Sequence, residues 1–404
     1  MLPVRYLSGC GKPNNPQFQR NPFFETLFVF CTFTTHKSVV LSSSKKQSSS
    51  LQEKVGISSP EITNVSAINQ IKNKRRQQPS AAELISGILS GNITALSRSI
   101  TLIESTNPEH SPKADEIIKG CLPHANKSIR IGITGVPGVG KSTFIEAFGT
   151  YLTQAGKKVA VLAVDPSSSI SHGSILGDKT RMEELVKDEN AFIRPSASGE
   201  NLGGVARKTR ETIILCEAAG FNTIIIETVG VGQSETAVHS MVDFFLLLKI
   251  SGAGDELQGI KRGIIEMADA IVINKADGDN IKKANQAKLE FNRALHLFPP
   301  KKSNWQPKVT TCSAITKEGI SDIWNTISDY FEMTKETGFF QEKRNEQNHF
   351  WMMETINEQL KSNFFNQPEI ITLLEQNKKA VQNDEISPFA AASDLLKFYF
   401  NKSR

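Results

Sequence analysis

The sequence predicts an α/β protein in which helices cover both faces of a doubly wound, mainly parallel sheet. Short, continuous apolar runs alternate with amphipathic segments, which is typical of parallel strands that are buried on both faces. The first of these runs leads directly into a glycine-rich pattern, as strands do in nucleotide-binding folds. The predicted strands are residues 131–134, 159–164, 223–226, 244–248, 270–273 and 309–311.

Residues 1–74 are predicted to stand outside this fold. The first fifty residues contain several basic side chains, among them Arg5, Arg20 and Lys37, but only one acidic side chain, Glu25. Serine is the most frequent residue in positions 42–50. A basic, serine-rich and acid-poor start is typical of a mitochondrial transit peptide. A disordered or misassigned upstream extension explains the same composition, and both interpretations stay open.

Helices are predicted on both sides of the sheet domain, which we expect to comprise residues 128–334. In the N-terminal helical segment, residues 75–127, Ser80 and Glu83 form a capping box in front of an amphipathic helix. In the C-terminal helical arm, residues 335–404, apolar side chains recur every four residues. This stripe either packs against the chain's own sheet or contacts a second subunit. Its members are Met352, Ile356, Leu360 and Phe364.

The composition excludes several functional classes. The net charge is only +5, from 47 basic and 42 acidic side chains, which argues for neither nucleic acid nor a membrane surface as partner. The five cysteines form no C-x-x-C pair, so we expect reduced thiols in a reducing compartment. No apolar run reaches the roughly 18 residues that a membrane span needs. We therefore expect a cytoplasmic protein, or one of the mitochondrial matrix in a eukaryote.

The glycine-rich pattern predicts a phosphate-binding loop (P-loop). It fits G-x-x-x-x-G-K-[ST] at every position, between a strand and an amphipathic helix. Glycines allow successive backbone N–H groups to point at phosphate oxygens, and Lys141 supplies the charge that stabilises the leaving phosphates. The predicted nucleotide contacts are Gly135, Val136, Pro137, Gly138, Val139, Gly140, Lys141, Ser142 and Thr143.

A second motif predicts that the base is guanine. Asn274, Lys275 and Asp277 form an N-K-x-D pattern at the end of an apolar run. A fixed Asp277 carboxylate accepts hydrogen bonds from guanine N1–H and the 2-amino group, whereas adenine would leave this charge unpaired. The segment Ser313, Ala314 and Ile315 follows the last strand, where a backbone N–H can meet guanine O6. The sequence therefore predicts GTP rather than ATP.

Acidic residues at strand ends predict a magnesium site. Asp165 and Glu227 follow apolar runs, and Asp178 lies in the loop between them. Because ligands bind at the carboxyl ends of parallel strands, we expect these carboxylates near the phosphates. Together with the Ser142 hydroxyl they form an oxygen ligand set for Mg²⁺.

The residue that positions the attacking water is not evident. The segment beginning at Glu227 reads E-x-x-G rather than the D-x-x-G of signalling GTPases, and Val231 stands where those proteins have glutamine. We therefore expect slow unaided hydrolysis that a mobile loop or a partner accelerates. Gln233 is a candidate for this role. Residues 251–262 form another glycine-rich, charged loop and are predicted to be a third switch.

The loop sequences resemble those of the MeaB/ArgK family of P-loop GTPases over roughly residues 75 to 400. The resemblance implies a SIMIBI-type GTPase domain and a homodimer that serves as a chaperone of adenosylcobalamin-dependent methylmalonyl-CoA mutase. Such a chaperone gates cofactor loading and protects the mutase from inactivation. The strings that carry the resemblance are residues 165–168, 173–182, 194–196, 227–235, 254–261 and 274–277.

The same resemblance assigns roles to particular residues. It implies that the arm is a dimerisation extension, which favours the subunit-contact interpretation of the stripe. It also makes Lys261 a candidate for partner-stimulated catalysis. Residues 169–173 depart from the family pattern, which puts the motion of the first switch in doubt but not the ligand.

Two other functions fit the same fold. A metallochaperone GTPase of the nickel-delivery kind should carry Cys or His ligands near its switches, and this sequence shows none there. A transport-system kinase or ATPase, the older label of the family, should carry an acceptor site, for which the sequence has no signature.

Overall fold

A computed structural model describes residues 79–164, 182–195, 202–228, 234–252 and 262–402. All of them belong to one of the chain's two compact units, Lys72–Arg404. The expectations for residues 1–74 lie outside the described residues. None of the described helices combines the length and the apolar composition that a membrane crossing requires.

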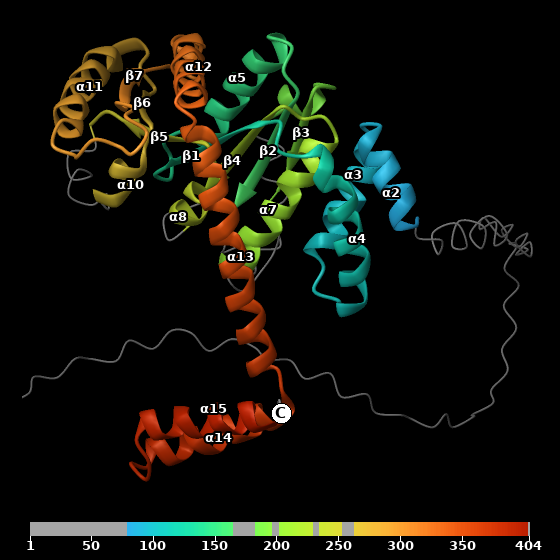
Figure 1. Cartoon of the computed structure of the whole chain (residues 1–404). Helices are drawn as coiled ribbons and strands as arrows, with labels where there is room; N and C mark the ends of the chain where they lie inside the picture. The colour runs from blue at the N-terminus through green and yellow to red at the C-terminus, as the bar shows by residue number, and fades with distance from the viewer. Residues whose placement is uncertain (1–78, 165–181, 196–201, 229–233, 253–261, 403–404) are drawn as a thin grey trace, which may run out of the picture. The chain divides into compact units, whose positions relative to one another are not determined.

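One parallel sheet organises the described residues (Figure 1). Its strand order is β3-β2-β4-β1-β5-β6-β7, so β1 lies at the centre. All six predicted apolar runs are strands. The structure adds the edge strand β3, which the prediction missed because only one of its four residues is buried. The strands are β1 (Ile129–Gly135), β2 (Val159–Val164), β3 (Ala191–Arg194), β4 (Thr223–Thr228), β5 (Phe244–Ile250), β6 (Ala270–Asn274) and β7 (Lys308–Thr311).

Helices cover both faces of this sheet, so the predicted doubly wound fold is confirmed. Adjacent residues of β4 show the two faces: Ile224 belongs to one buried cluster and Ile225 to another. One face packs against α5 (Lys141–Gln154) and α12 (Ile320–Glu336). The other face packs against α7 (Leu202–Ala218), α8 (Ser234–His239), α10 (Arg262–Met267) and α11 (Ile281–Leu295).

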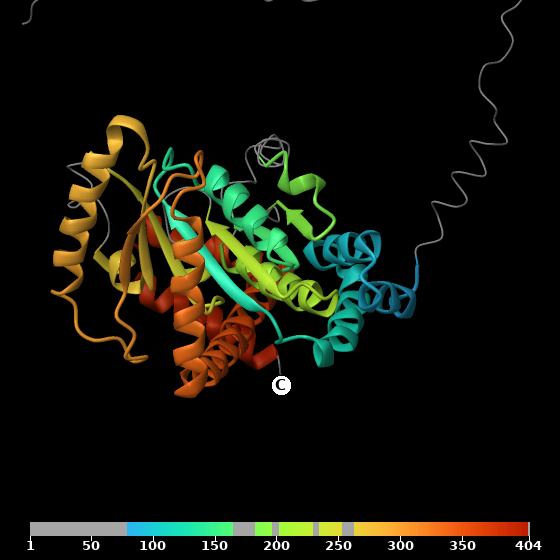
Figure 2. The ribbon, with the colours of Figure 1, turned by 90° about the horizontal axis from the view of Figure 1, so that it is seen from above.

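Three helices precede the sheet and pack beside its β3 edge, whereas α11 lies near the opposite edge (Figure 2). The predicted capping box is present, because Ser80 Oγ accepts from Glu83 N at 3.2 Å and the Glu83 carboxylate accepts from Ser80 N at 2.7 Å. The third helix was not predicted, since its polar sequence contributes only three buried residues. The helices are α2 (Ala81–Leu89), α3 (Ile93–Glu104) and α4 (Ser111–Cys121), with 3₁₀ turns η1 (Pro108–His110) and η2 (Leu122–His124).

The C-terminal arm consists of α13 (Phe339–Phe365), α14 (Pro368–Gln382) and α15 (Pro388–Lys402). It begins after Gly338, a few residues beyond the predicted boundary at 335, because α12 continues to Glu336. The apolar stripe lies on α13 as predicted. Its side chains are not covered by the chain's own sheet: Met352 is 53%, Ile356 43% and Leu360 57% exposed. The contact of the stripe with a second subunit stays a prediction. Two further 3₁₀ turns are η3 (Leu185–Lys187) and η4 (Gly278–Asn280).

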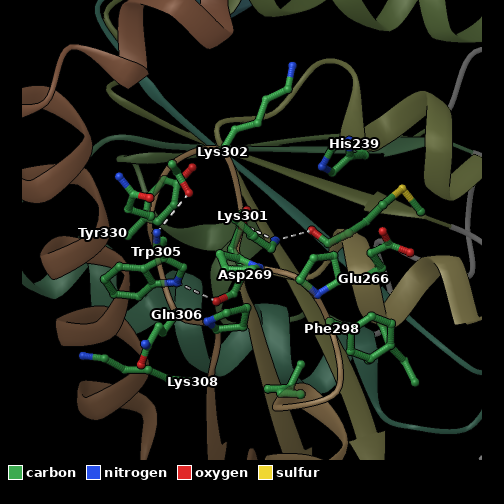
Figure 3. A pocket seen from close by; sticks show the side chains of 18 of the residues that line it. His239, Glu266, Asp269, Phe298, Lys301, Lys302, Trp305, Gln306, Lys308 and Tyr330 are labelled. Atoms are coloured by element: carbon green, nitrogen blue, oxygen red, sulfur yellow. Dashed lines mark hydrogen bonds and ion pairs between the residues drawn. The ribbon is translucent and has the colours of Figure 1, made fainter.

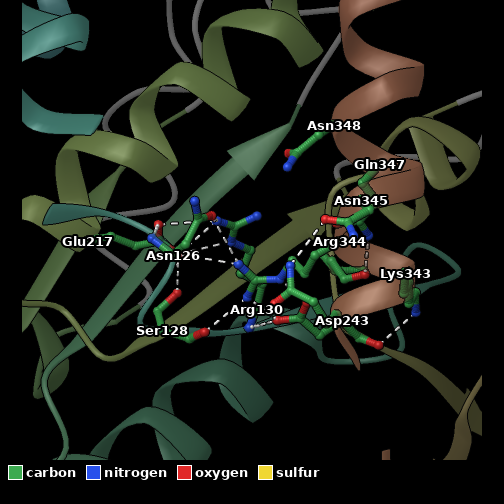
Figure 4. A network of polar contacts seen from close by, with 12 residues as sticks. Asn126, Ser128, Arg130, Glu217, Asp243, Lys343, Arg344, Asn345, Gln347 and Asn348 are labelled. Atoms are coloured by element: carbon green, nitrogen blue, oxygen red, sulfur yellow. Dashed lines mark hydrogen bonds and ion pairs between the residues drawn. The ribbon is translucent and has the colours of Figure 1, made fainter. Parts of the chain in front are cut away.

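A buried charge network joins α13 to the amino ends of the central strands (Figure 4). Arg130 on β1 pairs with Glu217 of α7 at 2.9 Å, and Arg344 Nη2 on α13 donates to Asp243 Oδ2 at 2.7 Å. Arg344 also donates to the carbonyl of Ser128 at 2.9 Å. Burial lowers the pKa of Arg130, while the neighbouring Glu217 carboxylate opposes this shift. Because these charges have left water, each depends on its partner to remain buried.

Replacing one member of the network should destabilise the protein. Arg344→Met leaves the buried Asp243 without its guanidinium, and we expect the free energy of unfolding to fall by about 3 kcal/mol. Urea denaturation followed by circular dichroism measures the change. The control is Lys378→Met, which breaks the exposed pair with Glu375 and should leave the midpoint nearly unchanged. Equal effects of the two substitutions would contradict the structural role of the network.

Candidate functional site

The P-loop forms a tight curve between β1 and α5, at the carboxyl end of the central strand. Gly138 and Gly140 have φ values of 81° and 89°, in the left-handed region that favours glycine. A Cβ atom on Gly140 would also lie 3.0 Å from the amide nitrogen of Asn274. At Gly135 a Cβ atom would lie 2.7 Å from the carbonyl oxygen of Leu248. The predicted glycines are therefore required by conformation and by close packing.

Lys141 points back into this curve. Its Nζ donates to the carbonyl of Gly135 at 2.8 Å, so the ammonium lies within the loop where successive N–H groups gather. Partial burial lowers the pKa of Lys141, and the Glu227 and Glu235 carboxylates act in the opposite direction. The site thus holds a partly desolvated cation flanked by two acids. A phosphate group can replace the carbonyl as its partner.

Asn274 ties three loops together. It ends β6 and is almost fully buried, and its Nδ2 donates to the P-loop carbonyl of Val139 at 2.9 Å. Its Oδ1 accepts from Ala314 N at 3.3 Å and from Cys312 Sγ at 3.4 Å, and both of these residues follow β7. The Asn274 amide therefore braces the P-loop against the chain after β7. Lys275 adds a bond from its Nζ to the carbonyl of Gly138 at 2.8 Å.

Asp277 is held by Ser313. The Ser313 hydroxyl donates to Asp277 Oδ2 at 2.6 Å and accepts from Thr316 N at 3.1 Å, so the carboxylate and the loop after β7 fix each other. Ser313 and Ala314 are buried, whereas the Ile315 side chain is 76% exposed. The structure brings both predicted guanine-recognition segments to one place. A carboxylate held in this way can face the N1–H and 2-amino donors of guanine.

Part of the predicted metal and catalytic set lies outside the described residues. Asp165, Asp178, Gln233 and Lys261 belong to this group, so their roles stay predictions. Ser142 is half-buried in the first turn of α5. Glu227 is only 5% exposed within β4, which continues one residue beyond it. The described residues contain no group of three His, Cys, Asp or Glu side chains that could hold a metal ion. Of the predicted metal ligands, the described residues include the Ser142 hydroxyl and the Glu227 carboxylate, which are oxygen ligands of the kind that Mg²⁺ prefers.

Three contributors to the site were not singled out from the sequence. Glu235, in the first turn of α8, is buried and acts electrostatically on Lys141. Cys312 bonds to Asn274, and burial raises the pKa of its thiol to about 12. Thr228 Oγ1 donates to Thr134 Oγ1 at 2.9 Å and links β4 to β1 beside the P-loop. Only the position of Cys312 next to Ser313 gave a signal that sequence reasoning could have used.

A groove of about 1260 Å³ lies at the opposite, amino end of β6 and β7 (Figure 3). Charged side chains that line the groove form ion pairs with each other. Lys301 bonds to Asp269 at 2.6 Å, and the indole of Trp305 donates to the Asp269 carbonyl at 2.9 Å. Burial is the main cause that lowers the pKa of His239 to about 4, so this imidazole is neutral at pH 7. These contacts explain the groove as a structural feature, and the candidate site is the one around the P-loop.

Comparisons with known proteins agree with this site. The family model for "Methylmalonyl Co-A mutase-associated GTPase MeaB" matches residues 96–369. The chain is 45% identical to GTPase ArgK of Escherichia coli, over 78% of this chain and 96% of that protein. It is 44% identical to the "Methylmalonic aciduria type A homolog, mitochondrial" of Mus musculus, over 81% of each chain. Among solved structures, one titled "LAO/AO transport system kinase" has a TM-score of 0.64 and 39% identity, over 79% of this chain and 97% of that chain.

Removal of the P-loop lysine should eliminate activity. Lys141→Ala deletes the cation inside the loop, and we expect GTP turnover to fall at least about 100-fold because charge on the phosphates loses its partner. Phosphate release measures turnover. Lys158→Ala, an exposed lysine beyond the same helix, is the control. Normal hydrolysis by the Lys141 variant would refute the P-loop assignment.

Asp277 should determine the choice of base. ITP lacks the 2-amino group of GTP, so it cannot use the second hydrogen bond to the carboxylate. We expect Asp277→Asn to reduce the preference for GTP over ITP by about 10-fold, since a charge-assisted bond is lost. Competition binding measures the preference, and Asp279→Asn at an exposed neighbouring position is the control. An unchanged preference would rule out this role.

Proposed function

This chain belongs to the MeaB family and is a GTPase, and we propose that it is a chaperone of an adenosylcobalamin-dependent acyl-CoA mutase, with methylmalonyl-CoA mutase as the main candidate. In this role GTP binding and hydrolysis gate adenosylcobalamin loading and protect the mutase from inactivation. The observation that supports the proposal most is the extent of the family match. Residues 96–369 include most of α3, the whole sheet and α13 as well as the P-loop.

The hydrolytic site is proposed to work by positioning and electrostatics. Lys141 and the P-loop N–H groups bind the phosphates, while Asn274 and Asp277 hold guanine in register with them. We propose that Ser142, Asp165, Asp178 and Glu227 hold Mg²⁺. The ion would neutralise charge on the phosphate oxygens.

Partner-stimulated hydrolysis is also part of the proposal. The E-x-x-G form of the segment after β4 has Val231 where signalling GTPases have glutamine. Lys261 and Gln233 are the residues we propose to complete the site when a partner binds. This dependence would link the use of GTP to the presence of the mutase.

We further propose that the protein acts as a homodimer through its arm. Large apolar side chains gather on α13 with about half of their surface exposed, among them Met352, Ile356 and Leu360. A row of exposed apolar side chains of this kind is typical of an interaction surface. A second copy of the chain, which presents the same row, is the proposed occupant.

The proposed location follows the host of the mutase. It is the mitochondrial matrix in a eukaryote, in keeping with the name of the mouse relative, and the cytoplasm in a bacterium.

The proposal is tested by mixing the full chain with methylmalonyl-CoA mutase and following GTP turnover. We expect the mutase to raise turnover at least about 10-fold, because the missing catalytic element is completed on binding. Lys141→Ala in the same mixture is the control for hydrolysis by contaminants. Turnover that no cobalamin-dependent acyl-CoA mutase alters would contradict the chaperone role and leave the GTPase activity intact.

A further inference from the structure

The long helix α13 makes a row of polar contacts to one short turn of the sheet domain. Only Arg344 and Gln347 of its 27 residues are buried. The turn, residues 240–243, connects α8 to β5 and is called here the α8–β5 turn. Side chains on one face of α13 donate to it (Figure 4). The bonds run from Lys343 Nζ to Asp243 O (2.7 Å), Arg344 Nη2 to Asp243 Oδ2 (2.7 Å), Gln347 Nε2 to Val242 O (2.8 Å) and Trp351 Nε1 to Ser240 O (3.1 Å).

The same turn is fixed to the strand that carries the P-loop. Asp243 N donates to the carbonyl of Arg130 at 2.9 Å, and Arg130 N donates to Asp243 Oδ2 at 2.8 Å. A Cβ atom on Gly132 would lie 3.0 Å from the side chains of both Val238 and Val242. The turn and the end of α8 therefore lie directly on β1, three residues before the P-loop begins. Val242 takes part in both contacts, through its side chain to β1 and through its carbonyl to α13.

The other end of α8 reaches the phosphate site. Glu235 lies in its first turn and is 4% exposed. Burial lowers the pKa of Lys141, and the negative charges of Glu227 and Glu235 oppose this shift, so Glu235 acts electrostatically on the phosphate-binding lysine. At six residues, α8 spans about 9 Å from this point to the turn. Phosphates that bind at Lys141 bring negative charge towards Glu235, and GTP brings more than GDP. The two nucleotides therefore interact differently with α8, as a ligand must in order to shift a conformational equilibrium.

We infer that α8 and the α8–β5 turn couple the phosphate state of the nucleotide to the attachment of α13. GTP displaces α8 relative to its position with GDP, and the bonds from α13 to the turn resist this displacement. The arm and the nucleotide are then linked reciprocally, so weakening the attachment of the arm changes nucleotide preference. This coupling gives the proposed partner function its regulation, while its test uses no mutase.

The first measurement is the ratio of the dissociation constants of GDP and a non-hydrolysable GTP analogue, in the full chain. Gln347→Leu removes the bond to Val242 and keeps the size of the side chain. We expect this variant to favour the GTP analogue over GDP by about 5-fold more than the unmodified protein does. Gln341→Leu is the matched control, because Gln341 is exposed on the same helix and its side chain bonds to Asn345 of that helix. A ratio within two-fold of the unmodified protein would overturn the inference.

The second measurement needs no altered residue at the turn. The chain has three tryptophans, so fluorotryptophan labelling gives three ¹⁹F resonances, and Trp351→Phe identifies the one on α13. We expect the Trp351 resonance of the otherwise unmodified protein to differ between the GDP and GTP-analogue states. An identical resonance in both states would overturn the coupling, also if Gln347→Leu failed to fold. Loss of mutase stimulation alone, with both measurements as expected, would contradict the proposed function and not this coupling.

Discussion

The nucleotide site depends on the side-chain amide of Asn274. Its donor and its acceptor are both used inside the protein, the first by the P-loop and the second by the chain after β7. Three loops that leave different strands are held in one register by this group. Because the amide is buried, losing either bond would leave an unpaired polar group away from water. The same amide restricts Gly140, because a Cβ atom at that position would lie only 3.0 Å from the Asn274 amide nitrogen. Gly140 of the P-loop and Asn274 of the guanine motif are thus packed directly against each other.

Much of the fold could be predicted because its signals are local. The apolar runs that became strands are buried on both faces, and the capping box before α2 needs only two side chains that are three positions apart at the helix start. The elements that escaped prediction are stabilised by neighbours instead. Strand β3 has one buried residue and pairs with β2 along one edge, and α4 buries Ala114, Ile117 and Cys121 against other helices. Their sequences contain too little periodicity to be distinguished from loops.

The residues of the site also fall into those with a local sequence signal and those whose role depends on distant neighbours. The P-loop and the guanine motif are continuous strings whose chemistry fixes their residue types, so their positions could be read directly. The partnership of Ser313 with Asp277, the thiol of Cys312 beside Asn274 and the effect of Glu235 on Lys141 join residues that are 36 to 94 positions apart or depend on burial. No local pattern records such pairs. The stripe on α13 had two interpretations for a related reason: periodicity identifies an apolar face and leaves open what covers it.

Because α13 is long, a small rotation where it is attached displaces its far end by a larger distance. From Gln347 to its last residue, Phe365, the helix extends for about 27 Å. A rotation of about 10° about the attachment would displace that end by about 5 Å, nearly one helical turn. In the proposed dimer, rearrangements too small to open the nucleotide site would therefore change which apolar side chains of the two arms meet. A small rotation at the base of a long helix is thus a larger displacement at its tip.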